Sequence, residues 1–150
     1  MIPGVMSDSG SGPPRIVVGV DGSQPSFEAL EWAAREARLR GARLEVLHAT
    51  FYRPEMLQLF PGAAKDEEAI LDVATARVRS MEPDVEVVAR QTGPPAAKAL
   101  VEASAGAELL VVGSRGLGGF DELVMGSVSH QCAHHGQCPV VIIRGGRSKD

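Results

Sequence analysis

Residues 15–30 read RIVVGVDGSQPSFEAL and join a short strand to a helix through one tight turn. The β-branched run 15–20 predicts a buried strand, and Asp21-Gly22-Ser23 is typical turn chemistry. Pro25 suits the first turn of a helix. Apolar residues then recur at helical spacing, namely Phe27, Leu30, Ala34 and Ala37. This strand–turn–helix unit is the building block of an α/β fold.

The same alternation continues to the end of the chain. Further strands are predicted over residues 43–50, 84–90, 108–112 and 139–144, and further helices over 64–80, 95–105 and 126–135. Residues 51–62 carry two prolines and several apolar side chains, and we interpret them as a loop with room for one helical turn. We therefore predict an open five-stranded parallel sheet of order 3-2-1-4-5, with helices on both faces, of the flavodoxin or Rossmann-like type.

Composition fits a single domain of this kind. The chain has 150 residues, of which 44% are apolar but only 4% aromatic, so its core is aliphatic, as helices packed on a parallel sheet require. We expect a domain over residues 15–145, with a disordered N-terminal tail (1–14) and a short C-terminal tail (146–150). The formal charge of −4 argues against nucleic acid as a partner.

Two further observations bear on location. No run approaches the ~18 apolar residues that span a bilayer, so no membrane partner is expected. Residues 1–14 lack the basic start and apolar centre of a secretory signal. Only two cysteines occur, Cys132 and Cys138, which suits a reducing compartment. We expect a cytoplasmic protein.

The stretch from Leu109 to Val128 points to a ligand. The strand LLVV is followed by Gly113-Ser114-Arg115-Gly116, and nine residues later by Gly126-Ser127-Val128 at a predicted helix start. Glycine lets backbone amides approach a phosphate closely, and a helix N-terminus adds free amide donors. Parallel strands present their carboxyl ends at one edge, so this segment, Asp21 and Ala49-Thr50 are expected to meet there.

Several motifs together resemble the ATP-binding branch of the universal stress protein family. They are Gly113-x-x-Gly116 followed by nine residues and Gly126-Ser127, VGVDGS at 18–23, LHA at 47–49, GPPA at 93–96 and CPVVIIR at 138–144. The resemblance covers residues 15–144 and implies the adenine nucleotide alpha hydrolase-like form of the fold. It also implies ATP, with Mg²⁺ as a possible companion, as the ligand. The nucleotide-binding residues it implies are Gly19, Val20, Asp21, Ala49, Gly113, Ser114, Arg115, Gly116, Gly118, Gly126, Ser127 and Val128.

Within that resemblance, the backbone of Ala49 would bind the adenine edge, and Ser127 and Val128 would bind phosphate. Two roles stay open for Asp21, a ribose or metal contact and a turn former. Arg115 is either a phosphate cation or a solvated loop residue. There is no G-x-G-x-x-G after the first strand and no P-loop lysine.

Other polar clusters are interpreted as structural. The cluster on and after the last predicted helix lacks the spacing of a zinc site and comprises His130, Cys132, His134, His135 and Cys138. Packing and interaction with the C-terminal end of the helix dipole are the favoured roles, and no metal ligand is assigned. The acidic run 66–68, Asp-Glu-Glu, is interpreted as surface charge at a helix start. No catalytic triad can be assigned, and no catalytic residue is predicted.

The leading functional hypothesis is a nucleotide-dependent regulatory module of the stress response. The alternatives are a slow ATPase or other nucleotide-binding enzyme of the same fold, and a nucleotide-free interaction protein. We also expect a homodimer through the last strand, residues 139–144, because a sheet edge can pair across a two-fold axis. The apolar cluster around Met56 and Phe60 could cover the nucleotide, contact a partner or close a small core.

Overall fold

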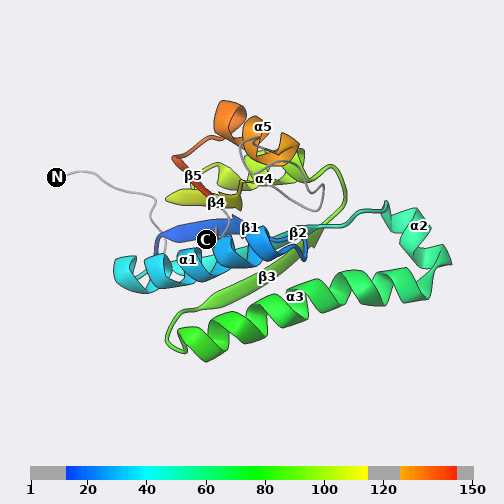
Figure 1. Ribbon diagram of the computed structural model, residues 1–150, viewed down its shortest axis with the longest axis horizontal. Coiled ribbons are helices and arrows are strands. Elements are labelled where there is room, and N and C mark those ends of the chain that lie inside the picture. Colours follow the sequence, from blue (N-terminus) through cyan, green and yellow to red (C-terminus); the bar gives the residue numbers. More distant parts are fainter. Residues whose placement is uncertain (1–12, 115–125, 145–150) are drawn as a thin grey trace, which may run out of the picture.

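The computed structural model describes residues 13–114 and 126–144 and contains one five-stranded parallel sheet (Figure 1). Its order is β3-β2-β1-β4-β5, which confirms the predicted topology. The strands are β1 (Arg15–Gly19), β2 (Arg43–Ala49), β3 (Val87–Thr92), β4 (Leu109–Gly113) and β5 (Val140–Ile143). The helices are α1 (Gln24–Arg40), α2 (Pro54–Leu59), α3 (Pro61–Met81), α4 (Ala96–Ser104) and α5 (Ser127–His135).

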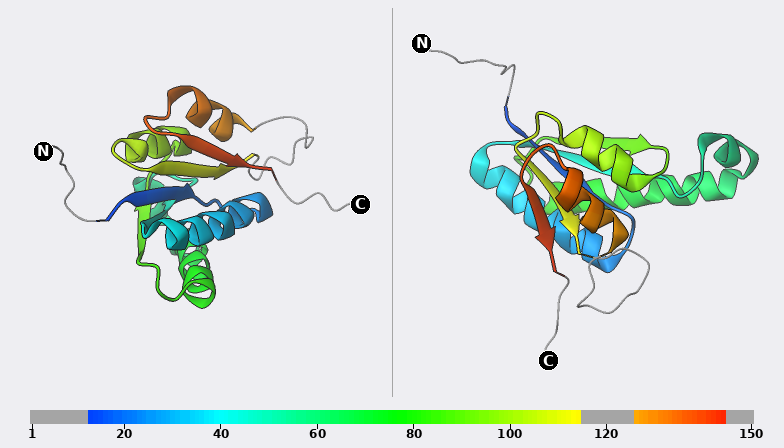
Figure 2. Two further views of the ribbon diagram at one scale, coloured as in Figure 1. Left: turned by 90° about the vertical axis from the view of Figure 1, so that its left-hand side faces the viewer. Right: turned by 90° about the horizontal axis from the view of Figure 1, so that it is seen from above.

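Helices cover both faces of the sheet. Helices α1 and α3 lie on one face and α4 and α5 on the other (Figure 2). Alternate residues of each strand point to opposite faces, so Ile16 and Val18 join the core under α1, whereas Val17 joins the core under α4 and α5. Both cores are almost wholly aliphatic, as the composition predicts.

Local sequence signals fix the first helix. Ser23 is the N-cap of α1, and its side chain accepts a hydrogen bond from the amide of Ser26. Gly41 ends the helix in the left-handed conformation, with φ of 63°. The chain therefore turns sharply at both ends of α1, which brings β2 alongside β1 in parallel.

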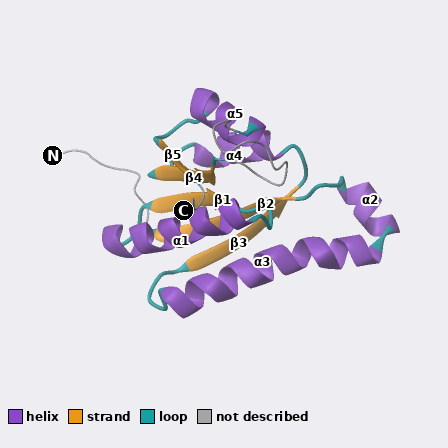
Figure 3. Ribbon diagram, viewed as in Figure 1, coloured by secondary structure: helices purple, strands orange, loops and turns teal. Residues whose placement is uncertain are grey.

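Three predicted boundaries are wrong by two residues or more. Strand β3 begins at Val87, not at residue 84, because a turn closed by the Val85 amide and the Glu82 carbonyl precedes it. It runs on to Thr92 because β2 extends far enough to pair Ala49 with Thr92. Helix α3 begins at Pro61, not at residue 64, and the expected loop before it contains the short helix α2 (Figure 3).

Candidate functional site

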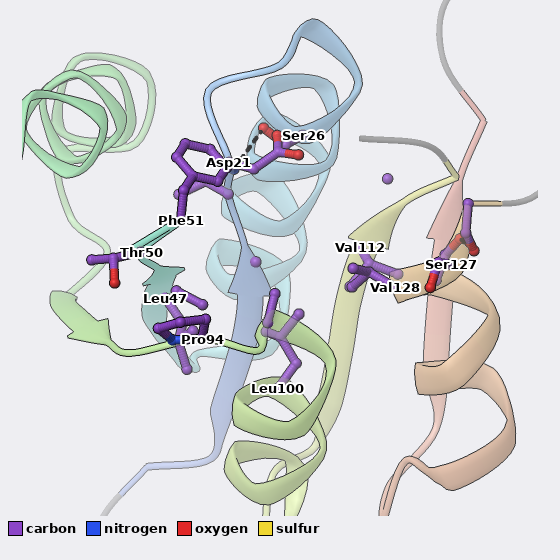
Figure 4. Close-up of a pocket in the computed structure, with 17 residues that line it drawn as sticks. Asp21, Ser26, Leu47, Thr50, Phe51, Pro94, Leu100, Val112, Ser127 and Val128 are labelled. Atoms are coloured by element: carbon purple, nitrogen blue, oxygen red, sulfur yellow. Dashed lines mark hydrogen bonds between the residues drawn. The ribbon is translucent and has the colours of Figure 1, made fainter. Parts of the chain in front are cut away.

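An open cleft of about 410 Å³ lies at the carboxyl edge of the sheet, between the ends of β1 and β4 (Figure 4). This is the point where the strand order reverses, and ligands of open α/β sheets bind in that crevice. Its volume falls within the range of small-molecule sites. The lining residues are Gly19, Val20, Asp21, Ser26, Leu47, Ala49, Thr50, Phe51, Pro94, Ala96, Leu100, Val112, Gly113, Gly126, Ser127, Val128 and Ser129.

The turn after β1 supplies the carboxylate of the cleft. Oδ1 of Asp21 accepts a hydrogen bond from the Ser23 amide at 2.9 Å. The hydroxyl of Ser26 accepts one from the Asp21 amide at 3.3 Å and donates to the Ser23 carbonyl at 2.9 Å. Asp21 thus forms the turn and also lines the cleft, so its two suggested roles are compatible.

The end of β2 presents backbone groups to the cleft. The Leu47 carbonyl accepts a hydrogen bond from the Val20 amide at 2.9 Å, so it faces β1. Two residues further on, the amide and carbonyl of Ala49 face the same side, beyond the end of β1. The Thr50 amide faces the other way and donates to the Thr92 carbonyl. Ala49 therefore offers a backbone donor and acceptor where a planar base edge would fit.

The opposite wall is the junction of β4 and α5. Both the Gly126 amide (2.6 Å) and the Ser129 hydroxyl (2.8 Å) donate to the Ser114 carbonyl, which ties the start of α5 to the end of β4. Ser127, Val128 and Ser129 of the first turn line the cleft, and that turn contains no acidic residue. Free helix amides and the positive end of the helix dipole favour an anion here.

Gly113 is glycine for a steric reason. A Cβ atom at this position would lie 2.9 Å from the carbonyl oxygen of Pro25 and 3.0 Å from its carbonyl carbon. The end of β4 therefore packs directly on the first turn of α1, which closes the floor of the cleft beside Asp21. The glycine is required for this close backbone approach, in addition to any role in ligand binding.

The structure brings most of the predicted site residues to this one cleft. Eight of them line it: Gly19, Val20, Asp21, Ala49, Gly113, Gly126, Ser127 and Val128. Ser114 is buried behind the wall and contributes its carbonyl to the α5 junction. Arg115, Gly116 and Gly118 lie outside the described residues. Binding by any of these residues stays a prediction.

Sequence reasoning missed several wall residues. The aliphatic side chains of Leu100 and Val112, together with Pro94, form an apolar side of the cleft (Figure 4). Leu100 and Val112 read as ordinary core positions in the sequence, and Pro94 belongs to the GPPA motif, to which the sequence analysis assigns no role in the site. Phe51 lies in the segment that the sequence predicts as an apolar loop, and its place at the cleft depends on contacts with residues of other elements.

The interpretation of Glu67 as a surface charge is wrong. Only 3% of its side chain is exposed, and its carboxylate lies 2.6 Å from Nε2 of the fully buried His48. Its second oxygen accepts a hydrogen bond from the Phe51 amide at 2.9 Å. The neighbouring Glu68 is exposed, as predicted. Glu67 is directed at the sheet because α3 packs against β2 and β3.

The histidine and cysteine cluster of α5 lies outside the cleft. Cys132 is buried in the core under α4 and α5, and burial raises the pKa of its thiol to about 11. The rings of His130 and His134 contact one another, with centroids 4.5 Å apart. Within residues 13–114 and 126–144, no group of three or more His, Cys, Asp or Glu side chains could hold a metal ion.

The cleft is suited to binding a small anion-bearing molecule. One side of it is apolar, and backbone amides of Ala49 and α5 face it from two other directions. Among the described lining residues, Asp21 is the only charged one. No described helix has the length and apolar character needed to cross a membrane.

A parallel α/β sheet with an amide-lined crevice at its switch point defines a class of small-ligand-binding α/β proteins. Within that class, the chain belongs to the universal stress protein family, whose model matches residues 13–144. A similar curated protein is universal stress protein Rv2005c of Mycobacterium tuberculosis, 38% identical over 134 residues, which are 86% of this chain and 45% of that protein. The chain spans about half the length of the curated relatives it matches.

Solved structures share the fold. A universal stress protein crystallised in complex with cAMP is 29% identical, with a TM-score of 0.70, covering 91% of this chain and 100% of its own. A family member from Arabidopsis thaliana with AMP bound is 22% identical, with a TM-score of 0.65, covering 89% and 93% of the two chains. These proteins bind adenine nucleotides.

Proposed function

We propose that this protein binds an adenine nucleotide, ATP in the first instance, and acts as a nucleotide-dependent regulatory module of the stress response. The observation that carries this proposal is the cleft, in which an apolar pocket and the free amides of α5 lie at the switch point of the sheet. The cAMP complex of a 29% identical family member supports the same ligand class. Because the curated relatives are about twice as long, the regulatory role is proposed for this unit alone.

Each end of the nucleotide has a place in the cleft. The base lies between the apolar wall and the Ala49 backbone, which provides one donor and one acceptor for the adenine edge. The phosphates lie at the start of α5, on the amides of Ser127 and Val128, with the close-packed Gly113 beneath them. Asp21 faces the ribose or a cation held by the phosphates.

A Mg²⁺ ion fits this site only together with the nucleotide. Among the described residues, the cleft contains one carboxylate, Asp21, and no preformed metal cluster. Magnesium commonly binds through one or two carboxylates, substrate phosphates and water, so a single aspartate is sufficient when phosphates are present. Asp21 would then hold the ion and offset the negative charge of the phosphates.

We propose a binding role in preference to catalysis. The described lining residues include no histidine, lysine or cysteine, and Asp21 already accepts a hydrogen bond from the Ser23 amide. A general base must lie within hydrogen-bond reach of the proton it removes, and the described cleft offers only this engaged carboxylate. Any hydrolysis of ATP is therefore expected to be slow.

We further propose a homodimer through β5, in the cytoplasm. Strand β5 is an edge of the sheet, and the carbonyls of Pro139 and Ile143 face β4. Backbone groups alternate along a strand, so those of Val140 and Ile142 face outward and are placed to pair with a second copy. The two free cysteines agree with a reducing compartment.

The test is to identify the ligand that the protein carries. Protein purified without added nucleotide is denatured and the released small molecules are analysed by mass spectrometry, followed by calorimetric titration of the emptied protein with ATP, ADP, AMP and cAMP. We expect an adenine nucleotide in the released fraction and saturable binding of ATP. Single-turnover assays with labelled ATP separate binding from catalysis. Absence of binding to all four nucleotides would support the interaction-protein alternative.

A further inference from the structure

A buried His–Glu pair lies beneath the cleft, on the opposite face of the sheet. His48 of β2 is fully buried and Glu67 of α3 is 3% exposed, and their Nε2 and Oε1 atoms are 2.6 Å apart. Nδ1 of His48 lies 2.8 Å from the Val20 carbonyl oxygen. Oε2 of Glu67 accepts from the Phe51 amide at 2.9 Å. His48 and Glu67 are therefore hydrogen-bonded to each other, and each also forms a hydrogen bond with one backbone group.

Hydrogen-bonding capacity fixes the proton content of the pair. A carbonyl oxygen only accepts, so Nδ1 of His48 carries a proton and donates it to Val20. The Nε2–Oε1 contact then needs one further proton, carried either by an imidazolium beside a carboxylate or by a carboxylic acid beside a neutral imidazole. In both forms the pair is neutral as a whole and all its polar contacts are satisfied.

Both backbone groups that the pair holds belong to residues lining the cleft. Val20 directly follows β1, and Phe51 directly follows the Ala49-Thr50 segment at the end of β2. In a continuing parallel ladder, the Val20 carbonyl would next pair with the Ala49 amide. The imidazole of His48 donates to that carbonyl, and the Ala49 amide, which lies on the same side of β2, faces the cleft beyond the end of β1.

The pair also orients an aromatic ring. The Phe51 ring packs edge-on against the His48 ring, with centroids 5.6 Å apart and an interplanar angle of 76°. Its side chain remains 49% exposed and lies at the mouth of the cleft beside Asp21 (Figure 4). A half-exposed ring fixed at this position offers an apolar surface to a planar base.

We propose that His48 and Glu67 form a positioning unit for the base end of the ligand site, acting through Val20, Ala49 and Phe51. This inference rests on the proposed nucleotide-binding function and adds residues that do not touch the ligand. A buried polar pair is weak evidence for stability, because desolvation offsets the attraction between its members. Its four contacts tie α3 and the end of β2 to each other and to Val20 and Phe51, two residues that line one half of the cleft.

The test compares three variants of the full chain. Glu67→Ala removes both contacts of the carboxylate. Glu67→Gln retains the geometry, because the amide oxygen accepts from Phe51 and the amide nitrogen donates to a neutral His48. Glu68→Ala, at the adjacent exposed position, is the matched control. Affinities for AMP and for ribose 5-phosphate, which lacks the base, are measured for each, with exchange of the Phe51 amide proton as a second measurement.

We expect Glu67→Ala to weaken AMP binding at least about tenfold while ribose 5-phosphate affinity changes less than about twofold, and to speed exchange of the Phe51 amide. Glu67→Gln and the control should bind AMP as the wild type does. Equal losses for both ligands, or unchanged AMP binding in folded Glu67→Ala, would overturn the positioning role. A wild-type protein that bound no AMP would overturn the proposed function and this inference with it. That outcome differs from failure of the positioning role alone, in which the wild type binds AMP and only the comparison of variants fails.

Discussion

Replacing Gly113 by alanine places a methyl group against the backbone at the start of α1. The new Cβ would lie 2.9 Å from the Pro25 carbonyl oxygen, 3.0 Å from its carbonyl carbon and 3.2 Å from its Cβ. None of these atoms is the end of a flexible side chain, so either the end of β4 or the first turn of α1 must move. Overpacking of this kind costs about 1–3 kcal/mol.

The displacement also reaches the ligand site. Gly113 lines the cleft, and Ser26, next to Pro25, lines it from the other side. A shift of either segment changes the cleft at the place proposed for the ribose and phosphates. We therefore expect Gly113→Ala to reduce both the free energy of unfolding and the affinity for ATP.

Urea unfolding, followed by fluorescence of the single tryptophan Trp32, measures the first effect. Trp32 is partly buried against the core, so its emission reports on that core. The matched control is Gly62→Ala in α3, where a Cβ meets nothing within 4 Å. That control should be neutral or stabilising by up to about 1 kcal/mol. A Gly113→Ala protein with the wild-type unfolding midpoint and ATP affinity would refute the argument.

Three further predictions concern the α5 end of the cleft, the buried thiol and the sheet edge. Ser127→Asp should weaken ATP binding about tenfold by charge repulsion in calorimetry, without lowering the melting temperature, because a carboxylate suits a helix N-terminus. Burial raises the pKa of the Cys132 thiol from 9.0 to about 11. Below pH 9.0 the thiol is protonated in the folded and the unfolded chain, so it does not change the free energy of unfolding. Between pH 9.0 and pH 11 the unfolded chain loses this proton first, and the free energy of unfolding should fall by about 2–3 kcal/mol. Urea unfolding of Cys132→Ala at both pH values should lack that component, and an identical pH dependence would contradict it. Ile142→Pro should yield folded monomers by light scattering, because the Ile142 amide faces away from β4. Val141→Pro should instead destabilise the fold, because the Val141 amide faces β4. An Ile142→Pro dimer would exclude this interface.

The sheet could be predicted because its strands are nearly pure aliphatic runs. Ile16, Val18 and Leu110 are fully buried and paired in the expected order. The glycine turns after them mark the carboxyl edge, so most backbone elements of the cleft followed from the same pattern. The ends of strand β3 are harder to predict because it is an edge strand with mostly exposed side chains, so no alternation of apolar and polar residues marks where it begins and ends.

Glu67 shows what a local pattern cannot supply. Its partner His48 lies 19 residues earlier, on another element, and only the packing of α3 on the sheet brings them together. A signal was nevertheless present in the helical spacing. Glu67, Leu71, Ala74 and Val78 are all buried and follow the apolar stripe of α3, so an acidic residue on that stripe indicates a buried partner.

The apolar wall of the cleft was the least predictable part. Leu100 and Pro94 come from α4 and the segment before it, and their contact with the cleft depends on how α4 crosses the sheet. Sequence gives the composition of such a helix but not its position over neighbouring strands. The same limit applies to Phe51, whose place is fixed by Glu67 and His48.

The most direct test of nucleotide binding in this cleft is a titration of the isotopically labelled protein with ATP, followed by backbone amide resonances. We predict saturable shifts concentrated at Val20, Ala49, Gly113, Ser127 and Val128, the amides that face or flank the cleft. Resonances of the distant Gly41 turn, at the other end of α1, should stay in place. Saturable shifts that leave the cleft amides unchanged, or no shifts at all, would contradict the account.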